Sequence, residues 1–297
     1  MSFSTDVKEE LLSLTLVSEC CRHAEGYGML LFGRTFSASS VSFAAENRVV
    51  AAKYAEEIRQ IIDTPPDVVD NEGKIAVVSV RTAAERRAIL AAFGHSPGEL
   101  TLRINRANLA NDCCFAAFIR GVFLACGTVS SPEKNYHLEF IVPFLKLSGD
   151  LFAFLQELGF HPKHIMRKGS HVIYFKESEA IEDLLTLMGA TNSTLRLINV
   201  KIGKDVRNHV NRRVNFETAN IDRSVHAGSV QINAIRKIMR LRGLDALSDG
   251  LREVAELRLE NPEASLLELE ELLGGKLSRS GINHRLKRLV EIADQLT

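Results

Sequence analysis

The sequence lacks the features of membrane and secreted proteins. No run of more than 12 residues is free of Asp, Glu, Lys and Arg, whereas a membrane-spanning helix needs about 20 mostly apolar residues. The opening residues Ser2–Asp6 do not form a secretory signal. Hydrophobic residues make up 45% and charged residues 25% of the 297 positions, which is typical of a globular protein with two or three domains. We therefore expect a cytoplasmic protein that does not contact membranes.

The five cysteines show no CxxC spacing, the usual arrangement of cysteine ligands in structural zinc sites. Four of them form two adjacent pairs, Cys20-Cys21 and Cys113-Cys114. We interpret all five as reduced residues in the core of a cytosolic protein. On this interpretation the chain holds neither a metal nor a cofactor.

The chain has no net charge, but its charges are unevenly distributed. There are 37 Lys and Arg and 37 Asp and Glu in total. Residues 192–242 carry 11 Lys and Arg against 3 Asp and Glu, and residues 276–297 carry 5 against 2. Clustered cations suit a polyanion such as DNA, although solvated helix faces would carry the same charges. Charge alone favours nucleic acid only slightly.

An internal repeat organises the first two hundred residues, with copies at 1–98 and 99–191. Each copy has a cysteine pair followed by a glycine, Gly33 or Gly127, and then the order strand, helix, two strands, helix. In the second copy we predict strands at 136–142, 164–167 and 171–175, and helices at 144–158 and 178–188. In the first copy we predict strands at 40–44, 67–69 and 75–80, and helices at 48–62 and 83–93. The pattern leaves open a further strand before residue 48.

Small residues in both motifs predict two closely packed helices. They are Gly26, Gly28 and Gly33 in the first motif and Ala117, Gly121, Ala125 and Gly127 in the second. Two unrelated core helices would have the same composition, but the matching flanks favour a repeat. Residues 119–127, Ile-Arg-Gly-Val-Phe-Leu-Ala-Cys-Gly, resemble the nine-residue LAGLIDADG motif of homing endonucleases.

The resemblance implies that the eighth position of each motif is a metal-binding acid. Cys126 occupies it in the second motif, and alignment of Gly33 with Gly127 gives Phe32 in the first. Phenylalanine offers no ligand atom, and a thiol is a poor ligand for Mg²⁺. Both are therefore degenerate metal positions, and we expect no catalytic residues and no nuclease activity. A nuclease that uses other ligands is the alternative.

The last third of the chain predicts a basic linker and a helical domain. Residues 192–223 are basic and rich in Asn, with little apolar periodicity, so we expect either a connector that orders on DNA or a plain tether. In the domain at 224–297 we predict helices at 229–242, 247–259, 266–273 and 279–296. A short helix, the turn at Gly274-Gly275 and a longer basic helix match the helix-turn-helix pattern.

The last helix has a buried face and a polar face. Ile282, Leu286, Leu289 and Ala293 lie within about 60° of one another and form the buried stripe. The other side carries groups that pair with bases or phosphates, although bundle helices also have basic outer faces. The predicted DNA contacts in this domain are Lys276, Arg279, Ser280, Asn283, His284, Lys287 and Arg288. Those in the linker are Arg207, Arg212 and Arg213.

Four segments resemble the WhiA family of bacteria. They are Ser2–Glu10 and residues 131–136 (SPEKNY), 208–222 and 278–289 (SRSGINHRLKRL). The resemblance covers essentially the whole chain. It implies an α+β fold, in which a degenerate two-repeat LAGLIDADG-like domain precedes an all-α helix-turn-helix domain similar to sigma-factor region 4.

The resemblance also implies a function. WhiA proteins are associated with transcriptional control of sporulation in some bacteria and with cell division and chromosome segregation in others, and in some lineages they act with a WhiB-like iron–sulfur protein. We expect a non-enzymatic, sequence-specific regulator that binds double-stranded DNA in the nucleoid as a monomer, with RNA polymerase as a further partner. A nucleoid-associated structural protein with little base preference is another reading.

Overall fold

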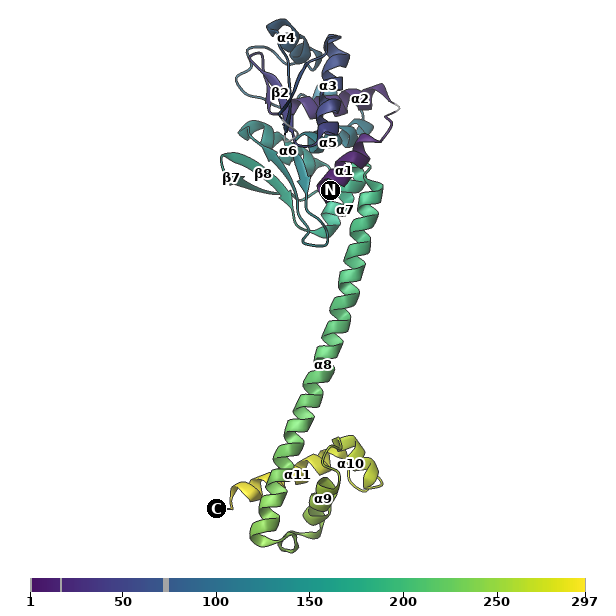
Figure 1. The fold of residues 1–297 in the computed structure, drawn as a ribbon, viewed down its shortest axis with the longest axis vertical. Helices are drawn as coiled ribbons and strands as arrows, with labels where there is room; N and C mark the ends of the chain where they lie inside the picture. Colours follow the sequence, from purple (N-terminus) through teal and green to yellow (C-terminus); the bar gives the residue numbers. More distant parts are fainter. Residues whose placement is uncertain (1, 17, 72–74, 297) are drawn as a thin grey trace. The chain divides into compact units, whose positions relative to one another are not determined.

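The computed structural model describes residues 2–16, 18–71 and 75–296. They form two compact units, one that ends at Lys204 and one that begins at Asp205 (Figure 1). Each unit has its own cluster of buried apolar side chains. Among the described residues, no helix is both long and apolar enough to span a bilayer.

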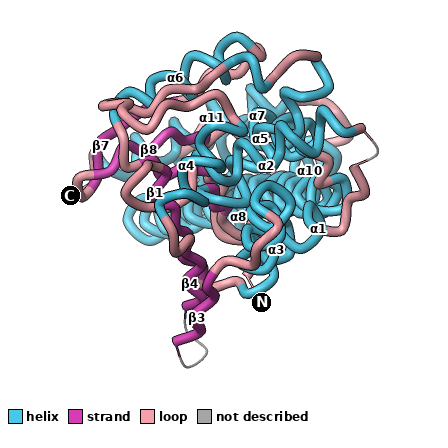
Figure 2. The backbone as a smooth tube through the Cα atoms, turned by 90° about the horizontal axis from the view of Figure 1, so that it is seen from above, coloured by secondary structure: helices cyan, strands magenta, loops and turns pink. Residues whose placement is uncertain are grey.

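The first repeat contains every element that the sequence predicts, and the helix α1 and the strand β1 in addition. After α1 (Phe3–Leu12) come α2 (Glu19–Leu31), β1 (Thr35–Phe36), β2 (Val41–Ala45), α3 (Arg48–Ile62), β3 (Asp67–Asn71), β4 (Ile75–Ser79) and α4 (Ala83–Ala92). The strands form an antiparallel sheet in the order β1-β2-β4-β3, and Figure 2 shows β3 and β4 side by side. Local signals fix the helix starts, because Asn47 caps α3 and Thr82 forms a capping box with Glu85 in α4.

The second repeat has the same order of elements. It consists of α5 (Asp112–Cys126), β5 (Gly127–Val129), β6 (Leu138–Val142), α6 (Leu145–Glu157), β7 (Lys163–Arg167), β8 (Ser170–Phe175) and α7 (Ser178–Met188), preceded by the short helix η1 (Arg106–Asn108). Its sheet has the order β5-β6-β8-β7 and is also antiparallel. Strand β5 corresponds to β1, so each repeat begins with a motif helix followed by a short strand. The predicted duplication is thus confirmed.

Helices α2 and α5 pack against each other through two of the predicted small residues. A Cβ atom added to Gly121 would lie 2.1 Å from the carbonyl oxygen of Glu25, and one added to Gly28 would lie 2.4 Å from that of Phe118. The other motif glycines have different neighbours: Gly26 faces Glu57 of α3, Gly33 faces Tyr54, and Gly127 faces Phe123 of its own helix. The packing role is therefore limited to one glycine of each motif helix.

The expectation of an irregular linker is wrong. Residues 192–223 belong to α8 (Thr191–Arg242), a continuous helix of 52 residues, so the predicted helix start at Ser229 is wrong as well. Apolar residues spaced by four and seven lie on one side of this helix, namely Val206, Val210, Val214, Ile221 and Val225, and each is more than half exposed. Their spacing is a helical signal that we had not recognised among the Asn and Arg residues.

The start of α8 is part of the first unit. The Glu10 carboxylate of α1 accepts hydrogen bonds from the backbone N–H groups of Asn192, at 2.7 Å, and Ser193, at 2.9 Å. It also accepts one from the Ser193 hydroxyl at 2.6 Å. Leu197 is buried in the core of this unit. The first unit thus extends beyond residue 191, where we placed the end of the second repeat.

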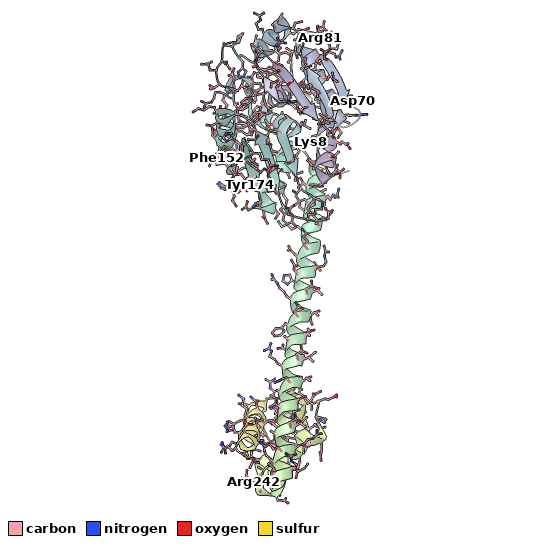
Figure 3. All side chains as sticks on the ribbon, turned by 60° about the vertical axis from the view of Figure 1, so that its left-hand side comes forward. Lys8, Asp70, Arg81, Phe152, Tyr174 and Arg242 are labelled. Carbon is pink, nitrogen blue, oxygen red and sulfur yellow. The ribbon has the colours of Figure 1, made fainter. Side chains whose placement is uncertain are left out.

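The second unit is all helical. The last turns of α8, which ends at Arg242 (Figure 3), pack with η2 (Leu244–Ala246), α9 (Asp249–Glu260), α10 (Leu266–Leu272) and α11 (Arg279–Asp294). Gly243 follows α8 with φ 76°, a left-handed conformation that favours glycine. The predicted helices after residue 243 are confirmed to within a few residues.

Candidate nucleic-acid interface

A glycine turn joins α10 to α11. Ser265 caps α10 through a capping box with Glu268. Gly274 and Gly275 follow with φ 63° and 73°, so two consecutive residues adopt the left-handed conformation that other residues rarely tolerate. Ser278 then begins α11 by accepting a hydrogen bond from the backbone N–H of Gly281 at 3.3 Å. The sequence thereby fixes the helix-turn-helix geometry locally.

Helix α11 divides into the two predicted faces. Ile282, Leu286 and Leu289 are completely buried and Ala293 is nearly so, which confirms the buried stripe. Of the predicted contact residues in this unit, Asn283 is half-buried and the other six are exposed: Lys276, Arg279, Ser280, His284, Lys287 and Arg288. The exposed side of α11 is therefore polar and basic along its first three turns.

Not every arginine of the second unit faces solvent. Arg285 donates from Nη1 to the carbonyl oxygen of Gly250 at 3.1 Å and so ties α11 to α9. Arg258 is buried, donates to the carbonyl oxygen of Ala264 at 2.6 Å, and has its pKa lowered by burial. Arg288 forms an ion pair with Glu291 at 2.7 Å, between Nη1 and Oε2, and both side chains are exposed. Arg285 and Arg258 are therefore structural. Arg288 can contact a phosphate group once its exposed ion pair with Glu291 breaks.

Acidic side chains mark a second side of this unit. Helix α10 carries Glu268, Glu270 and Glu271, and the first and last of these are exposed. Phosphate groups would be repelled from this surface. The charge distribution therefore disfavours the approach of a polyanion along α10.

The three predicted linker arginines, Arg207, Arg212 and Arg213, are exposed on α8. Arg213 pairs with Glu217 at 2.9 Å, one helical turn later. Two lysines of the same basic block are instead used within the first unit. Lys201 pairs with Glu179 at 2.6 Å, and Lys204 donates to the carbonyl oxygen of Pro132 at 2.6 Å. The block therefore offers fewer cations to a partner than its composition suggests.

The structure changes the alignment of the two motifs. The cysteine pairs, the packed glycines Gly28 and Gly121, and the buried strand residues Phe36 and Val129 all match with an offset of 93 residues. With this offset, Gly33 rather than Phe32 corresponds to Cys126. The match of Gly33 with Gly127, which the final glycine of the motif suggests, therefore places the first degenerate metal position one residue too early. The acid is replaced in both motifs under either alignment.

A cation lies beside Cys126. Lys8 of α1 (Figure 3) donates from Nζ to the carbonyl oxygen of Leu124 at 3.0 Å and lies 5.7 Å from the centre of the Phe123 ring. Burial lowers the pKa of Lys8 to about 8 and raises that of the Cys126 thiol to about 12. At neutral pH this end of the motif thus presents an ammonium and a neutral thiol, an arrangement that repels a divalent cation.

A buried ion-pair cluster joins the motif helices to α3, and sequence reasoning missed it. Arg120 donates from Nη1 to Glu25 Oε2 at 3.1 Å and from Nε to the carbonyl oxygen of Met188 at 2.7 Å. Lys53 lies 2.6 Å from Glu57 and 3.8 Å from Glu25. Burial raises the pKa of Glu25, and the charges of Arg120 and Lys53 oppose that rise. Both buried carboxylates are paired with cations, as expected for structural groups rather than metal ligands.

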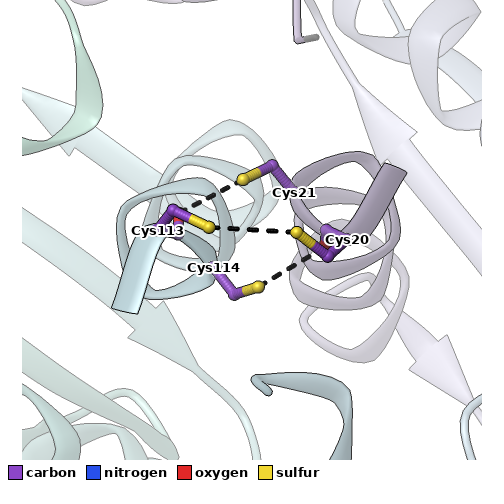
Figure 4. Close-up of side chains that lie close together, drawn as sticks. All are labelled: Cys20, Cys21, Cys113 and Cys114. Carbon is purple, nitrogen blue, oxygen red and sulfur yellow. Dashed lines mark hydrogen bonds between the residues drawn. The ribbon is translucent and has the colours of Figure 1, made fainter. Parts of the chain in front are cut away.

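The cysteine pairs also meet, although their spacing gave no sign of it. The Sγ atoms of Cys20 and Cys113 are 3.8 Å apart (Figure 4). All five cysteines are free thiols, and Cys113 is exposed. The interpretation as core residues is therefore wrong for Cys113. Cys114 is buried, and the other three are partly buried against the core.

The comparisons with known proteins agree with this architecture. Residues 115–207 match the family described as the WhiA LAGLIDADG-like domain, and residues 210–293 match the WhiA C-terminal HTH domain. A probable cell division protein WhiA of Lachnospira eligens is 37% identical over 309 residues, which cover all of this chain and 98% of the relative. The chain belongs to the WhiA family.

Other WhiA proteins support the assignment. The probable cell division protein WhiA of Ruminiclostridium cellulolyticum is 38% identical over 307 residues, covering all of this chain and 98% of the relative. The crystal structure of full-length DUF199/WhiA from Thermatoga maritima shares the fold, with a TM-score of 0.61 and 23% identity, and covers 100% of this chain and 99% of that one. The predicted family and the predicted α+β fold class, a LAGLIDADG-like domain of helices and strands followed by a helical HTH domain, are thus confirmed, and the HTH domain supports DNA binding.

Proposed function

We propose that this WhiA protein is a sequence-specific DNA-binding regulator that reads bases through α11 and does not cleave DNA. The observation that carries the proposal is the exposed side of α11. Its buried stripe leaves Ser280, His284 and Lys287 exposed on the opposite face. An α-helix of this kind fits the major groove, where each base pair presents a distinct pattern of donors and acceptors.

The start of α11 supplies the base-reading groups. Recognition helices place their N-terminal residues at the base edges, and Ser280, Asn283 and His284 occupy the first two turns. An asparagine amide pairs bidentately with adenine, and imidazole and hydroxyl groups accept or donate single hydrogen bonds. These three residues are the proposed specificity determinants.

Cations around this group supply the phosphate contacts. Lys276 and Arg279 flank the start of α11, and Lys287 and Arg288 lie further along the helix. Contacts to phosphate fix the position of a protein on DNA but carry no sequence information themselves. The exposed arginines of α8, Arg207, Arg212 and Arg213, are proposed to add further contacts of this kind.

The absence of nuclease activity is a second part of the proposal. Phosphodiester hydrolysis with Mg²⁺ needs carboxylate or other oxygen ligands at the motif ends. Gly33 and Cys126 supply none, and the Lys8 ammonium lies beside Cys126. The relatives are named for cell division, and we propose that the DNA sites of this protein control genes of cell division, with chromosome segregation or sporulation as the linked process.

Competition binding with the full chain tests the proposal. DNA bound by the protein is selected from random duplexes and then competed against unselected DNA at fixed salt. A regulator should prefer its selected site by a factor of about 10³ or more. Substitution of His284 by Ala should reduce this preference, whereas Arg252→Ala in α9 should preserve it. An equal affinity for selected and random DNA would instead favour the nucleoid-associated structural role.

A further inference from the structure

The two cysteine pairs occupy equivalent positions on the motif helices. Cys20 and Cys21 are the second and third residues of α2, and Cys113 and Cys114 are the second and third residues of α5. The packing of α2 on α5 brings the four thiols together, although 93 residues separate Cys20 from Cys113. We call these four residues the cysteine cluster. Each repeat thus supplies one half of it.

The sulfur atoms converge closely enough to share one ion. All four Sγ atoms lie within 4.8 Å of one another, and those of Cys20 and Cys113 are 3.8 Å apart. In a tetrahedral zinc site with Zn–S bonds of about 2.3 Å, the sulfurs are separated by about 3.8 Å. The Cys21 thiol donates to the carbonyl oxygen of Cys113 at 3.4 Å, and that of Cys114 to the carbonyl oxygen of Cys20 at 3.7 Å (Figure 4). To close a tetrahedron, these two thiols exchange their carbonyl acceptors for the ion, and the sulfur atoms approach from at most 4.8 Å to about 3.8 Å.

The position of the cluster in the fold suits the thiolates that a metal requires. Both helices point their N-termini at the cluster, and the partial positive charge there stabilises an anionic sulfur. The residues before the two helices, Ser18 and Asn111, make no capping hydrogen bond with their side chains. Cys113 is exposed and Cys114 is buried, which gives an ion a route from solvent to an anchored ligand.

We propose that the cysteine cluster binds one Zn²⁺ ion through four thiolates and thereby ties the start of α2 to the start of α5. Each coordinated thiol releases its proton to solvent, so binding strengthens as pH rises. A soft ligand set of four sulfurs selects zinc over Mg²⁺ or Ca²⁺. A two-iron cluster would spread its four cysteines over two metal atoms, which fits sulfurs packed around one point less well. The cysteine cluster belongs to the first unit and α11 to the second, and this proposal does not depend on the DNA-binding function.

Cobalt substitution in the full chain tests the proposal. The protein is reduced, freed of metal with a chelator and titrated with Co²⁺, then with Zn²⁺. We expect one Co²⁺ per chain, with the intense visible absorption of a tetrahedral thiolate complex, and its displacement by an equimolar amount of Zn²⁺. The titration of the wild-type chain is decisive by itself: a reduced protein without that absorption would overturn the proposal.

Variants locate the site. The double variant Cys20→Ser/Cys113→Ser should lose Co²⁺ binding, and the matched control Cys126→Ala should retain one Co²⁺ per chain because Cys126 lies at the other end of α5. Zn²⁺ should raise the unfolding temperature of the wild type and of the control but not that of the double variant. Loss of binding in the control, with binding preserved in the double variant, would contradict the assignment. So would a stable disulfide between Cys20 and Cys113 in a chain that binds no Co²⁺ after reduction.

Discussion

Gly28 and Gly121 hold the motif helices in contact, because each lies against the backbone of the opposite helix. No side chain fits at either position: an added Cβ would lie 2.4 Å from the carbonyl oxygen of Phe118 in one case and 2.1 Å from that of Glu25 in the other. The helix crossing sets the distance between the two repeats. It also sets the distance between the cysteine pairs at the starts of the same helices.

Substitution of Gly121 by Ala should destabilise the first unit. The new methyl group would meet the backbone of α2, which cannot move aside as a flexible side chain would, so we expect a loss of about 1–3 kcal/mol. Gly149→Ala in α6 is the matched control, since nothing lies within 4 Å of its added Cβ. That control should stabilise the helix by about 0.5–1 kcal/mol. Denaturant unfolding of the two variants would measure the difference, and equal stabilities would contradict the close crossing.

The chain should not cleave duplex DNA with Mg²⁺ or Mn²⁺, and restoring the acids should not make it do so. In the variant Gly33→Asp/Cys126→Asp, the first new side chain would start 2.9 Å from the Tyr54 hydroxyl, and the second would form beside the Lys8 ammonium. Incubation of supercoiled plasmid with each protein and metal is the measurement. Metal-dependent nicking by the wild type, absent from Cys126→Ala purified in the same way, would contradict the proposal.

Base-reading and phosphate-contacting residues of α11 should differ in their salt dependence. Asn283→Ala or His284→Ala should cost about 1–3 kcal/mol on the selected site and little on random DNA. Lys287→Ala should weaken both alike and reduce the slope of log K against log salt by about 0.9 for one lost phosphate contact. Helix α11 should stay folded in all three variants, because none of the substituted residues belongs to the buried stripe. Equal losses on both DNAs for every variant would show that α11 reads no bases.

Glu291→Gln should strengthen binding to DNA. The substitution frees Arg288 from its ion pair at 2.7 Å and removes a negative charge from the exposed side of α11. The gain should be modest on selected and random DNA alike, because an exposed ion pair contributes about 0–1 kcal/mol, and it should fade at high salt. Glu256→Gln on α9 is a control for the change in net charge. A greater gain in that control than in Glu291→Gln would argue against contact through α11.

Most of the fold could be predicted because its signals are local. Capping residues such as Ser265 and Ser278 mark helix starts, and the glycines at 274 and 275 mark the turn that identifies the DNA-binding motif. The sequence leaves a strand before residue 48 open but does not locate β1, because two residues carry no alternation pattern. Helix α8 was missed although Val206, Val210 and Val214 show the spacing of a helix, since Asn and Arg between them suggested a flexible connector.

The tertiary features of the candidate sites could not be predicted in the same way. The exposed face of α11 follows from the periodicity of a single helix. The cysteine cluster and the pair between Glu25 and Arg120 depend instead on where two helices cross, and their members are more than 90 residues apart in the chain. The hydrogen bond from Arg285 to the carbonyl oxygen of Gly250 is likewise a tertiary contact. Such contacts follow from the packing and not from any short pattern.

Through Glu10, helix α1 caps the start of α8, a segment far away in the sequence. The N–H groups of Asn192 and Ser193 have their acceptor 182 and 183 residues earlier in the chain. During synthesis, α1 emerges before α8, so the Glu10 carboxylate has no partner until the segment 182 residues later has been made. A deletion or fusion that displaces α1 would therefore fray α8 at its first turn, and its effect would be felt far from the altered end.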